Sequence, residues 1–292
     1  MRLPADRLAS LATEACLLEA RSPKPGNVSP GRPFRDMHHE DFVASAEAAG
    51  PELGRAGERP LGETILAAAQ ATRLRTTANT NLGIILLLAP LSRAAALSAD
   101  PLQAAVEDVL QDTTIADAEA AYEAIRLCRP GGIGAAPAED VANQPTVTLR
   151  VAMALAADRD EIAREYATGF AITFGTGAPA LRDARESGLG WEDATLETYL
   201  TLLAREPDTL IARKLGMATA REVSGRAEAA LAAGGVRTSG GRAAIAEFDA
   251  GLRDAQNSRN PGTTADLTAA ALFAVLVEDA RADHRSRTSR AQ

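Results

Sequence analysis

The chain has 292 residues and a formal net charge of −8 at pH 7; 46% of its residues are hydrophobic, but only 3% are aromatic. This length allows one large domain or two modest ones with a sizeable core. The acidic balance argues against a general nucleic-acid-binding surface but is compatible with a local cationic pocket for an anionic ligand. The abundance of alanine, the best helix former, favours an all-helical domain.

Two cysteines, Cys16 and Cys128, are too few for a disulfide framework and are typical of buried thiols in a reducing compartment. No N-terminal signal peptide is recognised, and the longest apolar run, Leu82 to Leu91, is too short to cross a bilayer. We therefore expect a cytoplasmic protein with no membrane or nucleic-acid partner.

Hydrophobic residues at helical spacing predict helices along the first half of the chain. The first covers residues 6–21 and is ended by Pro23 and Pro25. Gly50-Pro51 is expected to end the second helix. Asp100 is expected to cap the helix that begins at Pro101. The helices expected in this half cover 6–21, 39–50, 63–75, an apolar stretch from residue 82, a stretch from residue 101, and 115–127.

The second half follows the same pattern, and no segment alternates with the period of a strand. We predict one all-α domain of ten to twelve helices over residues 1–282, followed by a polar tail, 283–292, that frays. The helices expected here cover 146–157, 160–172, 193–205, 209–233, 241–254 and 265–282.

Five polar loops interrupt these helices, and each combines Gly or Pro with Asn, Asp, Thr or Lys. Such loops present free N–H groups and short polar side chains, as a phosphate site requires. The loops are PKPGN (23–27), RDM (35–37), ANTNLG (78–83), EPDTLIARKLG (206–216) and NPGTTADL (260–267).

The last two loops allow a structural and a functional interpretation. In NPGTTADL, Thr263 or Thr264 can cap the next helix, with Asp266 in its first turn; alternatively, the loop holds a phosphate and Asp266 a metal. In EPDTLIARKLG, Asp208 can cap a helix that carries Arg213 and Lys214. These two cations form surface pairs in one interpretation and contact phosphates in the other.

Lys24 and Lys214 are the only lysines in the chain, and both lie in glycine-containing polar loops. Lysine provides a compact cation that suits a single phosphate oxygen, so both are candidate phosphate contacts. The alternative for Lys24 is a solvated lysine on a proline-stiffened turn. The adjacent His38 and His39 face different sides of a helix, and RPGGIG (129–134) follows a helix, so we expect neither a histidine metal site nor a dinucleotide loop.

Taken in order, five segments resemble the triphosphoribosyl-dephospho-CoA synthase family, often called CitG, from about Ala12 to Val277. The resemblance implies an all-α enzyme that joins ATP to 3'-dephospho-CoA through ribose and releases adenine. The product is the precursor of an acyl-carrier-protein prosthetic group used in citrate and malonate decarboxylation. The segments are EACLLEARSPKPGNVS, RDMHHEDFVASA, GETILAAAQATRLRTTANTNLG, DTLIARKLG and NPGTTADLTAAALF.

Several positions depart from the family pattern. Phe34 stands where the family has a histidine, and Asn81 and Leu82 replace the histidine and lysine of the family's NTHKG. Lys214 and Leu215 are inserted near the end of the fourth segment. These departures indicate a divergent branch whose acceptor can differ, for example in a methanopterin-type one-carbon cofactor pathway. Family residues that are kept are Asp36, Met37, Asn79, Thr80, Gly83, Asp208, Thr209, Arg213, Gly216, Pro261, Gly262, Ala265 and Asp266.

The resemblance and the loops together predict a Mg²⁺-dependent transferase acting on ATP or another nucleoside triphosphate and a cofactor-like acceptor. Asp36, Asp208 and Asp266 are the predicted catalytic residues. The same three are predicted Mg²⁺ ligands, with two further candidates in Glu63 and in Glu14, which lies on the apolar stripe of the first helix. The predicted phosphate and nucleotide contacts are Lys24, Gly26, Asn27, Asn79, Thr80, Asn81, Arg213, Lys214, Gly262, Thr263 and Thr264.

Two further expectations remain open at this stage. A helical module that binds a nucleotide without turnover is the alternative function, because Phe34, Asn81 and Leu82 can mark lost catalysis. The alanine-rich surface is compatible with a homodimer. Both functional hypotheses require the polar loops to converge on one cavity, and both fail if the side chains of residues 24, 36, 208 and 266 lie on unrelated outer surfaces.

Overall fold

The computed structural model describes the backbone of residues 1–132 and 134–290 and the side chains up to residue 284. These residues form fourteen α-helices, a π-helical turn and two short 3-10 helices. No strand occurs in the described ranges, so the predicted all-α fold is confirmed. The count exceeds the ten to twelve helices expected because the structure breaks one predicted helix in two and adds another.

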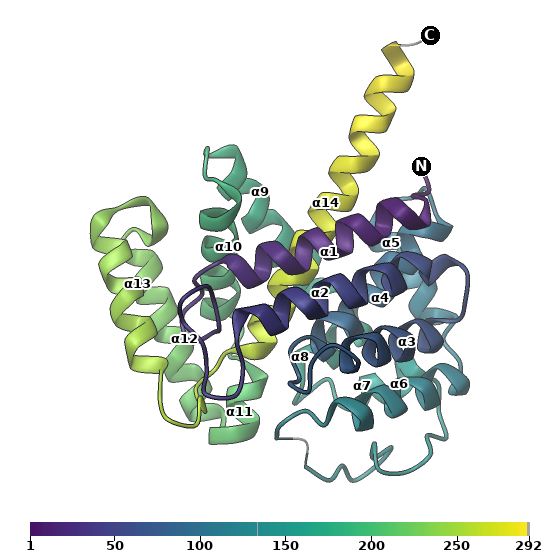
Figure 1. Ribbon diagram of the computed structural model, residues 1–292, viewed down its shortest axis with the longest axis horizontal. Coiled ribbons are helices and arrows are strands. Elements are labelled where there is room, and N and C mark those ends of the chain that lie inside the picture. The colour runs from purple at the N-terminus through teal and green to yellow at the C-terminus, as the bar shows by residue number, and fades with distance from the viewer. Residues whose placement is uncertain (133, 291–292) are drawn as a thin grey trace.

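The N-terminal helices lie side by side in layers, as Figure 1 shows. The apolar run forms α4, whose side chains are almost all buried, and α1 packs along α2 on one side of it. These helices are α1 (Ala5–Arg21), α2 (His39–Gly54), α3 (Leu61–Arg73), α4 (Leu82–Leu97), α5 (Leu102–Gln111) and α6 (Ile115–Cys128).

The C-terminal helices add a second, smaller hydrophobic cluster, formed by α10, α12 and α13, beside the main core. The last helix, α14, runs between the two groups and contacts α1, α4 and α10 (Figure 1). The helices are α7 (Leu149–Ala154), α8 (Glu161–Thr168), α9 (Ala178–Glu186), α10 (Trp191–Arg205), α11 (Thr209–Leu215), α12 (Met217–Ala232), α13 (Ser239–Leu252) and α14 (Gly262–Arg290).

The predicted end of the second helix at Gly50-Pro51 is wrong, because α2 continues to Gly54 with Pro51 inside it. Its glycines serve close packing against α1. A Cβ atom at Gly50 would lie 1.9 Å from Thr13 Oγ1, and one at Gly54 would lie 2.4 Å from the Ala5 carbonyl oxygen. Small residues at the crossing let the two helix backbones approach each other.

Other boundaries differ for local reasons. The helix predicted over 209–233 breaks at Gly216, whose φ of +89° is incompatible with a continuous helix. The helix predicted over 160–172 ends at Thr168, and the π-helical turn (Thr173–Gly177) and α9 after it were not predicted. Asp100 does not cap α5, whose N-cap is Pro101.

Both cysteines are buried free thiols, as predicted. The helix α14 continues through the expected fraying tail to Arg290, and the last two residues of that tail, 291–292, lie outside the described residues. In the described part of the chain no single helix meets the length and hydropathy of a membrane span. The pair α4 and α5 meets them only together, across a bend of 107°.

The α1–α2 contact predicts opposite effects for two glycine substitutions. Gly54→Ala places a methyl group against the backbone of α1 and should lower the free energy of unfolding by about 1–3 kcal/mol. Gly225→Ala, in the open middle of α12, should raise it by up to about 1 kcal/mol because alanine favours the helix. Urea unfolding of both variants measures the difference, and equal effects would contradict the packing role.

Candidate active site

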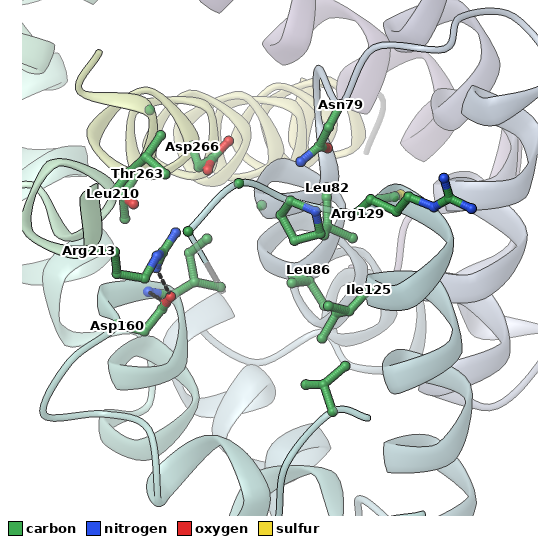
Figure 2. Close-up of a pocket in the computed structure, with 18 of the residues that line it drawn as sticks. Asn79, Leu82, Leu86, Ile125, Arg129, Asp160, Leu210, Arg213, Thr263 and Asp266 are labelled. Atoms are coloured by element: carbon green, nitrogen blue, oxygen red, sulfur yellow. Dashed lines mark hydrogen bonds and ion pairs between the residues drawn. The ribbon is translucent and has the colours of Figure 1, made fainter. Parts of the chain in front are cut away.

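A cavity of about 900 Å³ lies where α4, α8, α11 and α14 meet (Figure 2). All five predicted polar loops contribute at least one residue to its wall. Asn27 comes from the first loop and Asp36 from the second. The third loop lines the cavity with all of its residues, the fourth with Arg213 and Lys214, and the fifth with Asp266 and its neighbours. Far-apart polar loops therefore converge on one cavity.

Asp266 is the carboxylate that faces this cavity most directly from α14. The helix begins at Gly262, three residues earlier than predicted, so Asp266 lies in its second turn rather than its first. A Cβ atom at Gly83 would lie 2.0 Å from Asp266 Oδ2, which explains a glycine at the start of α4. Among the described residues the carboxylate has no hydrogen-bond partner. Burial and the nearby Glu19 raise the pKa of Asp266 well above its usual range.

Asp208 lies behind the cavity wall instead of on it. Its Oδ1 accepts the Ile211 N–H at 3.0 Å and so caps α11, as predicted. Its Oδ2 accepts the Thr264 N–H at 2.8 Å and the Thr264 hydroxyl at 2.9 Å. Asp208 therefore joins the first turns of α11 and α14, and neither its oxygens nor the Thr264 donors are directed at a ligand.

Arg213 and Lys214 bring positive charge to the same wall. Arg213 is ion-paired with Asp160, the N-cap residue of α8, and Figure 2 shows this pair beside Thr263 and Asp266. Lys214 is accessible at the cavity edge. Both pack against the loop after α6, where a Cβ atom at Gly132 would lie 3.5 Å from Arg213 Cβ. This loop begins at Arg129, the C-cap residue of α6, as expected, but the lining of the cavity by residues 129–132 and 134 was not predicted.

The placement of Lys24 differs from the predicted phosphate contact. The side chain is fully buried and does not reach the cavity wall. Its Nζ lies 3.0 Å from Glu19 Oε1 and donates to the carbonyl oxygens of Glu19 and of Ser22, the latter at 3.2 Å. The Gly26 N–H donates to Asp249 Oδ1 at 2.8 Å, so it too is already used within the protein.

The remaining polar contacts divide into two groups. In the first group the side chains bond within the protein. Thr80 and Asn81 both bond to Ser45, and Asn81 also bonds to Thr72. Asn27 Nδ2 donates to Tyr199 Oη at 3.0 Å. For Asn79 no side-chain partner is found in the described residues. Figure 2 shows it across the cavity from Thr263, on the side of Leu82 and Arg129.

The predicted metal ligands do not assemble into a preformed site. Glu14 and Glu63 are exposed and lie away from the cavity, and Asp36 is exposed at its edge. Among the described side chains, no three of the acid, histidine or cysteine type are close enough together to hold a metal ion. Of the five predicted Mg²⁺ ligands, Asp36 and Asp266 line the cavity, and Glu14, Glu63 and Asp208 do not.

Sequence reasoning missed three residues of this site. Glu19 and Asp160 are carboxylates on the wall, and Asn260 lines it with a buried Oδ1 atom that has no partner among the described residues. For Glu19, the only feature of the sequence that pointed to the site was its position five residues before Lys24. Asp160 has the form of an ordinary helix cap, and Asn260 that of a turn residue.

A family model described as CitG, ATP:dephospho-CoA triphosphoribosyl transferase, matches residues 5–285. The chain belongs to the CitG family. CitG proteins are transferases, and the CitG resemblance seen in the five segments is thereby confirmed over nearly the whole chain.

Individual relatives agree with this assignment. A protein of Azotobacter vinelandii named "Probable 2-(5''-triphosphoribosyl)-3'-dephosphocoenzyme-A synthase" is 31% identical over 287 residues, covering 92% of this chain and 90% of its own length. One of the same name from Stutzerimonas stutzeri is 29% identical over 287 residues, with 92% and 91% coverage. A solved structure named "Crystal structure of putative triphosphoribosyl-dephospho-coA synthase from Archaeoglobus fulgidus" matches with a TM-score of 0.63 and 31% identity, covering 81% of this chain and 99% of that one.

The contact between Gly83 and Asp266 predicts a double-mutant coupling in this CitG protein. Gly83→Ala should lower the free energy of unfolding by about 1–3 kcal/mol, because the new methyl group displaces the Asp266 carboxylate. In an Asp266→Ala background the same change should cost nothing or stabilise slightly. Chemical unfolding of the four proteins tests this, and an equal cost in both backgrounds would refute the contact.

A second prediction concerns Glu161, which is buried behind Asp160 and has no partner for its Oε2 in the described residues. Burial, then repulsion from Asp208, raises the pKa of Glu161 to about 9, although Arg164 opposes the shift. The folded state then keeps a proton that the unfolded state releases near pH 4.5. The stabilisation that comes from this retained proton is fully present below that pH. As the pH rises toward 9, the free energy of unfolding falls by about 1.4 kcal/mol per pH unit.

Glu161→Gln mimics the protonated side chain and removes this slope. Its melting temperature should exceed that of the wild type by a margin that grows from pH 5 to pH 8.5. The matched variant Glu228→Gln, at an exposed position of α12, should show no such growth. A margin that is constant with pH would contradict the raised pKa.

Proposed function

We propose that this CitG-family transferase moves the triphosphoribosyl group of ATP, or of another nucleoside triphosphate, to a hydroxyl group of 3'-dephospho-CoA or a related cofactor-like acceptor and releases the base. The observation that carries the proposal is the meeting of Asp266, Arg213 and Lys214 in one cavity. A triphosphate needs cations, and the breaking of a glycosidic bond needs a carboxylate near the sugar.

The size of the cavity supports a substrate of this class. At about 900 Å³ it lies near the upper end of the range for small-molecule sites, about 300–1,000 Å³. One side carries Asp266, Arg213 and Thr263, and Leu82, Leu86 and Ile125 form an apolar surface on the other (Figure 2). A nucleotide has the same division into a charged and an uncharged part.

The transfer breaks one bond to the anomeric carbon of ribose and forms another. The electron pair of the bond to the base leaves with the base, and the acceptor oxygen supplies the pair for the new bond. The acceptor's hydroxyl proton ends on the released base, so no net proton is consumed. Asp266, whose carboxyl has no partner among the described residues, is suited to handle that proton, and Arg213 and Lys214 are suited to bind the phosphates, which stay attached throughout.

The proposal includes Mg²⁺ bound mainly through the triphosphate. Asp266 and Asp36 are the cavity carboxylates from the predicted ligand set that remain available to it. When bound, the ion neutralises phosphate charge. Asp208, Glu14 and Glu63 are left out of this set. Asp208 accepts three hydrogen bonds within the protein behind the cavity wall, and the other two lie away from the cavity.

One observation favours an acceptor other than dephospho-CoA. Leu82 replaces a lysine of the family pattern and lines the cavity, so this position of the wall carries an apolar side chain instead of a cationic one. An acceptor in another cofactor pathway, such as one for a methanopterin-type one-carbon cofactor, would meet that change. A panel of acceptors assayed with ATP and Mg²⁺ for adenine release distinguishes the two.

The proposal predicts separate effects for two substitutions. Asp266→Asn should lower kcat for adenine release by about 10²–10⁴-fold with little change in the binding of ATP. Arg213→Ala should weaken ATP binding by about tenfold or more, because it removes a charge-assisted contact to phosphate. Chromatographic assay of adenine and calorimetric titration with ATP measure the two effects.

Arg242→Ala is the matched control, since Arg242 forms an exposed pair with Asp193 away from the cavity, and it should leave both values unchanged. Binding of ATP without adenine release from any acceptor, together with no effect of Asp266→Asn, would favour the non-catalytic nucleotide-binding module.

A further inference from the structure

The carboxylate of Glu19 occupies an unusual position in the structure. It comes from the last turn of α1, is only 3% exposed, and nevertheless lines the cavity. A buried carboxylate is costly unless a cation or several donors compensate it. Lys24 provides the cation, with its Nζ 3.0 Å from Glu19 Oε1. The Lys24 side chain is 0% exposed and the Glu19 side chain 4%.

Lys24 is fully committed to this pair. A lysine has three N–H donors, and here they meet the Glu19 carboxylate, the Glu19 carbonyl oxygen and the Ser22 carbonyl oxygen. The backbone on both sides is restricted by Pro23 and Pro25. The compact ammonium group thus fits inside a turn of backbone carbonyls, where a planar guanidinium would not. This is the reason for a lysine at this position in an arginine-rich chain.

The pair fixes a carboxylate at the cavity wall in an environment that differs from that of Asp266. Glu19 has a buried cation at hydrogen-bond distance. Asp266 has no such partner among the described residues, and the negative charge of Glu19 is one cause of its raised pKa. Two carboxyl groups in one cavity are therefore held in different environments, an arrangement that suits different roles.

We infer that Glu19 is a further catalytic residue of this enzyme: held in place by Lys24, it faces the ribose and stabilises the positive charge that develops at the anomeric carbon during transfer. Lys24 is its positioning residue. The inference rests on the proposed function and adds the residue that stabilises its transition state. In the step described above, Glu19 forms no bond and exchanges no proton, so the balance of atoms and electrons is unchanged.

The physical argument is one of preorganised charge. Glycosyl transfer passes through an oxocarbenium-like transition state, in which ribose carries positive charge that the bound nucleotide lacks. A carboxylate that its ion pair fixes in place before the reaction stabilises that state more than the ground state, and removing one such preorganised group typically costs about 10²–10³-fold in kcat. The effect should therefore fall on kcat and leave nucleotide binding nearly unchanged.

The test uses the full-length protein with ATP, Mg²⁺ and the acceptor that supports adenine release. Glu19→Gln should lower kcat by about 10²–10³-fold, with KM for ATP within about threefold of the wild type. Glu19→Asp, which keeps the charge, should retain more activity than Glu19→Gln. Lys24→Met should leave the Kd of ATP within about threefold, because none of its donors is directed at the cavity.

The double variant Glu19→Gln/Lys24→Met separates catalysis from folding. It removes both buried charges, so its melting temperature should recover toward that of the wild type, while kcat stays low. Asp117→Asn, which alters a buried, hydrogen-bonded carboxylate outside the cavity, should lower stability without lowering kcat.

Three results would overturn the inference: recovery of kcat together with melting temperature in the double variant, a loss of activity in Glu19→Gln that matches its loss of folded protein, or a tenfold weaker Kd of ATP in Lys24→Met. Failure of the proposed function gives a different result, because the wild type itself would then release no adenine with any acceptor.

Discussion

The site depends on the hydrogen bonds by which Asp208 joins two helices. Its carboxylate accepts hydrogen bonds from the first turns of both α11 and α14, which are far apart in the sequence. Because each helix is rigid, fixing the two starts together also fixes Arg213, one turn along α11, relative to Asp266, one turn along α14. The N–H groups of both helices favour a negative group at this junction. A residue that touches no ligand thereby determines the geometry of the cavity.

The charged side chains of the cavity lie around this junction of α11 and α14. Acidic groups approach from α1, α8 and α14, and each meets a different environment: Glu19 is paired with Lys24, Asp160 is paired with Arg213, and Asp266 faces the cavity without a partner in the described residues. Burial and, after it, repulsion from neighbouring carboxylates raise the pKa of Asp266 and of Glu161. Cationic and acidic side chains thus line a single cavity.

The departures from the CitG pattern have unequal consequences in three dimensions. Phe34 is buried and outside the cavity wall, and its N–H donates to the Met37 carbonyl oxygen at 2.8 Å. Asn81 is buried and bonds to Ser45 and Thr72, so its amide group holds the loop before α4. Leu82 replaces a charged side chain with an apolar one on the wall itself. Two departures thus change the charge of the wall: Leu82 removes a cation, and the inserted Lys214 adds one.

The sequence by itself determined the helical class, the position of most helices and the five loops that carry polar groups, because periodicity, prolines and caps act over a few residues. It could not distinguish a glycine that ends a helix from one that lets helices touch, as at Gly50 and Gly54. Nor could it say which polar groups bond within the protein. Only the tertiary structure turned Lys24 toward Glu19, placed Asp208 behind the wall and left Asp266 facing the cavity, because hydrogen-bond partners are chosen among groups that folding brings together from distant parts of the chain.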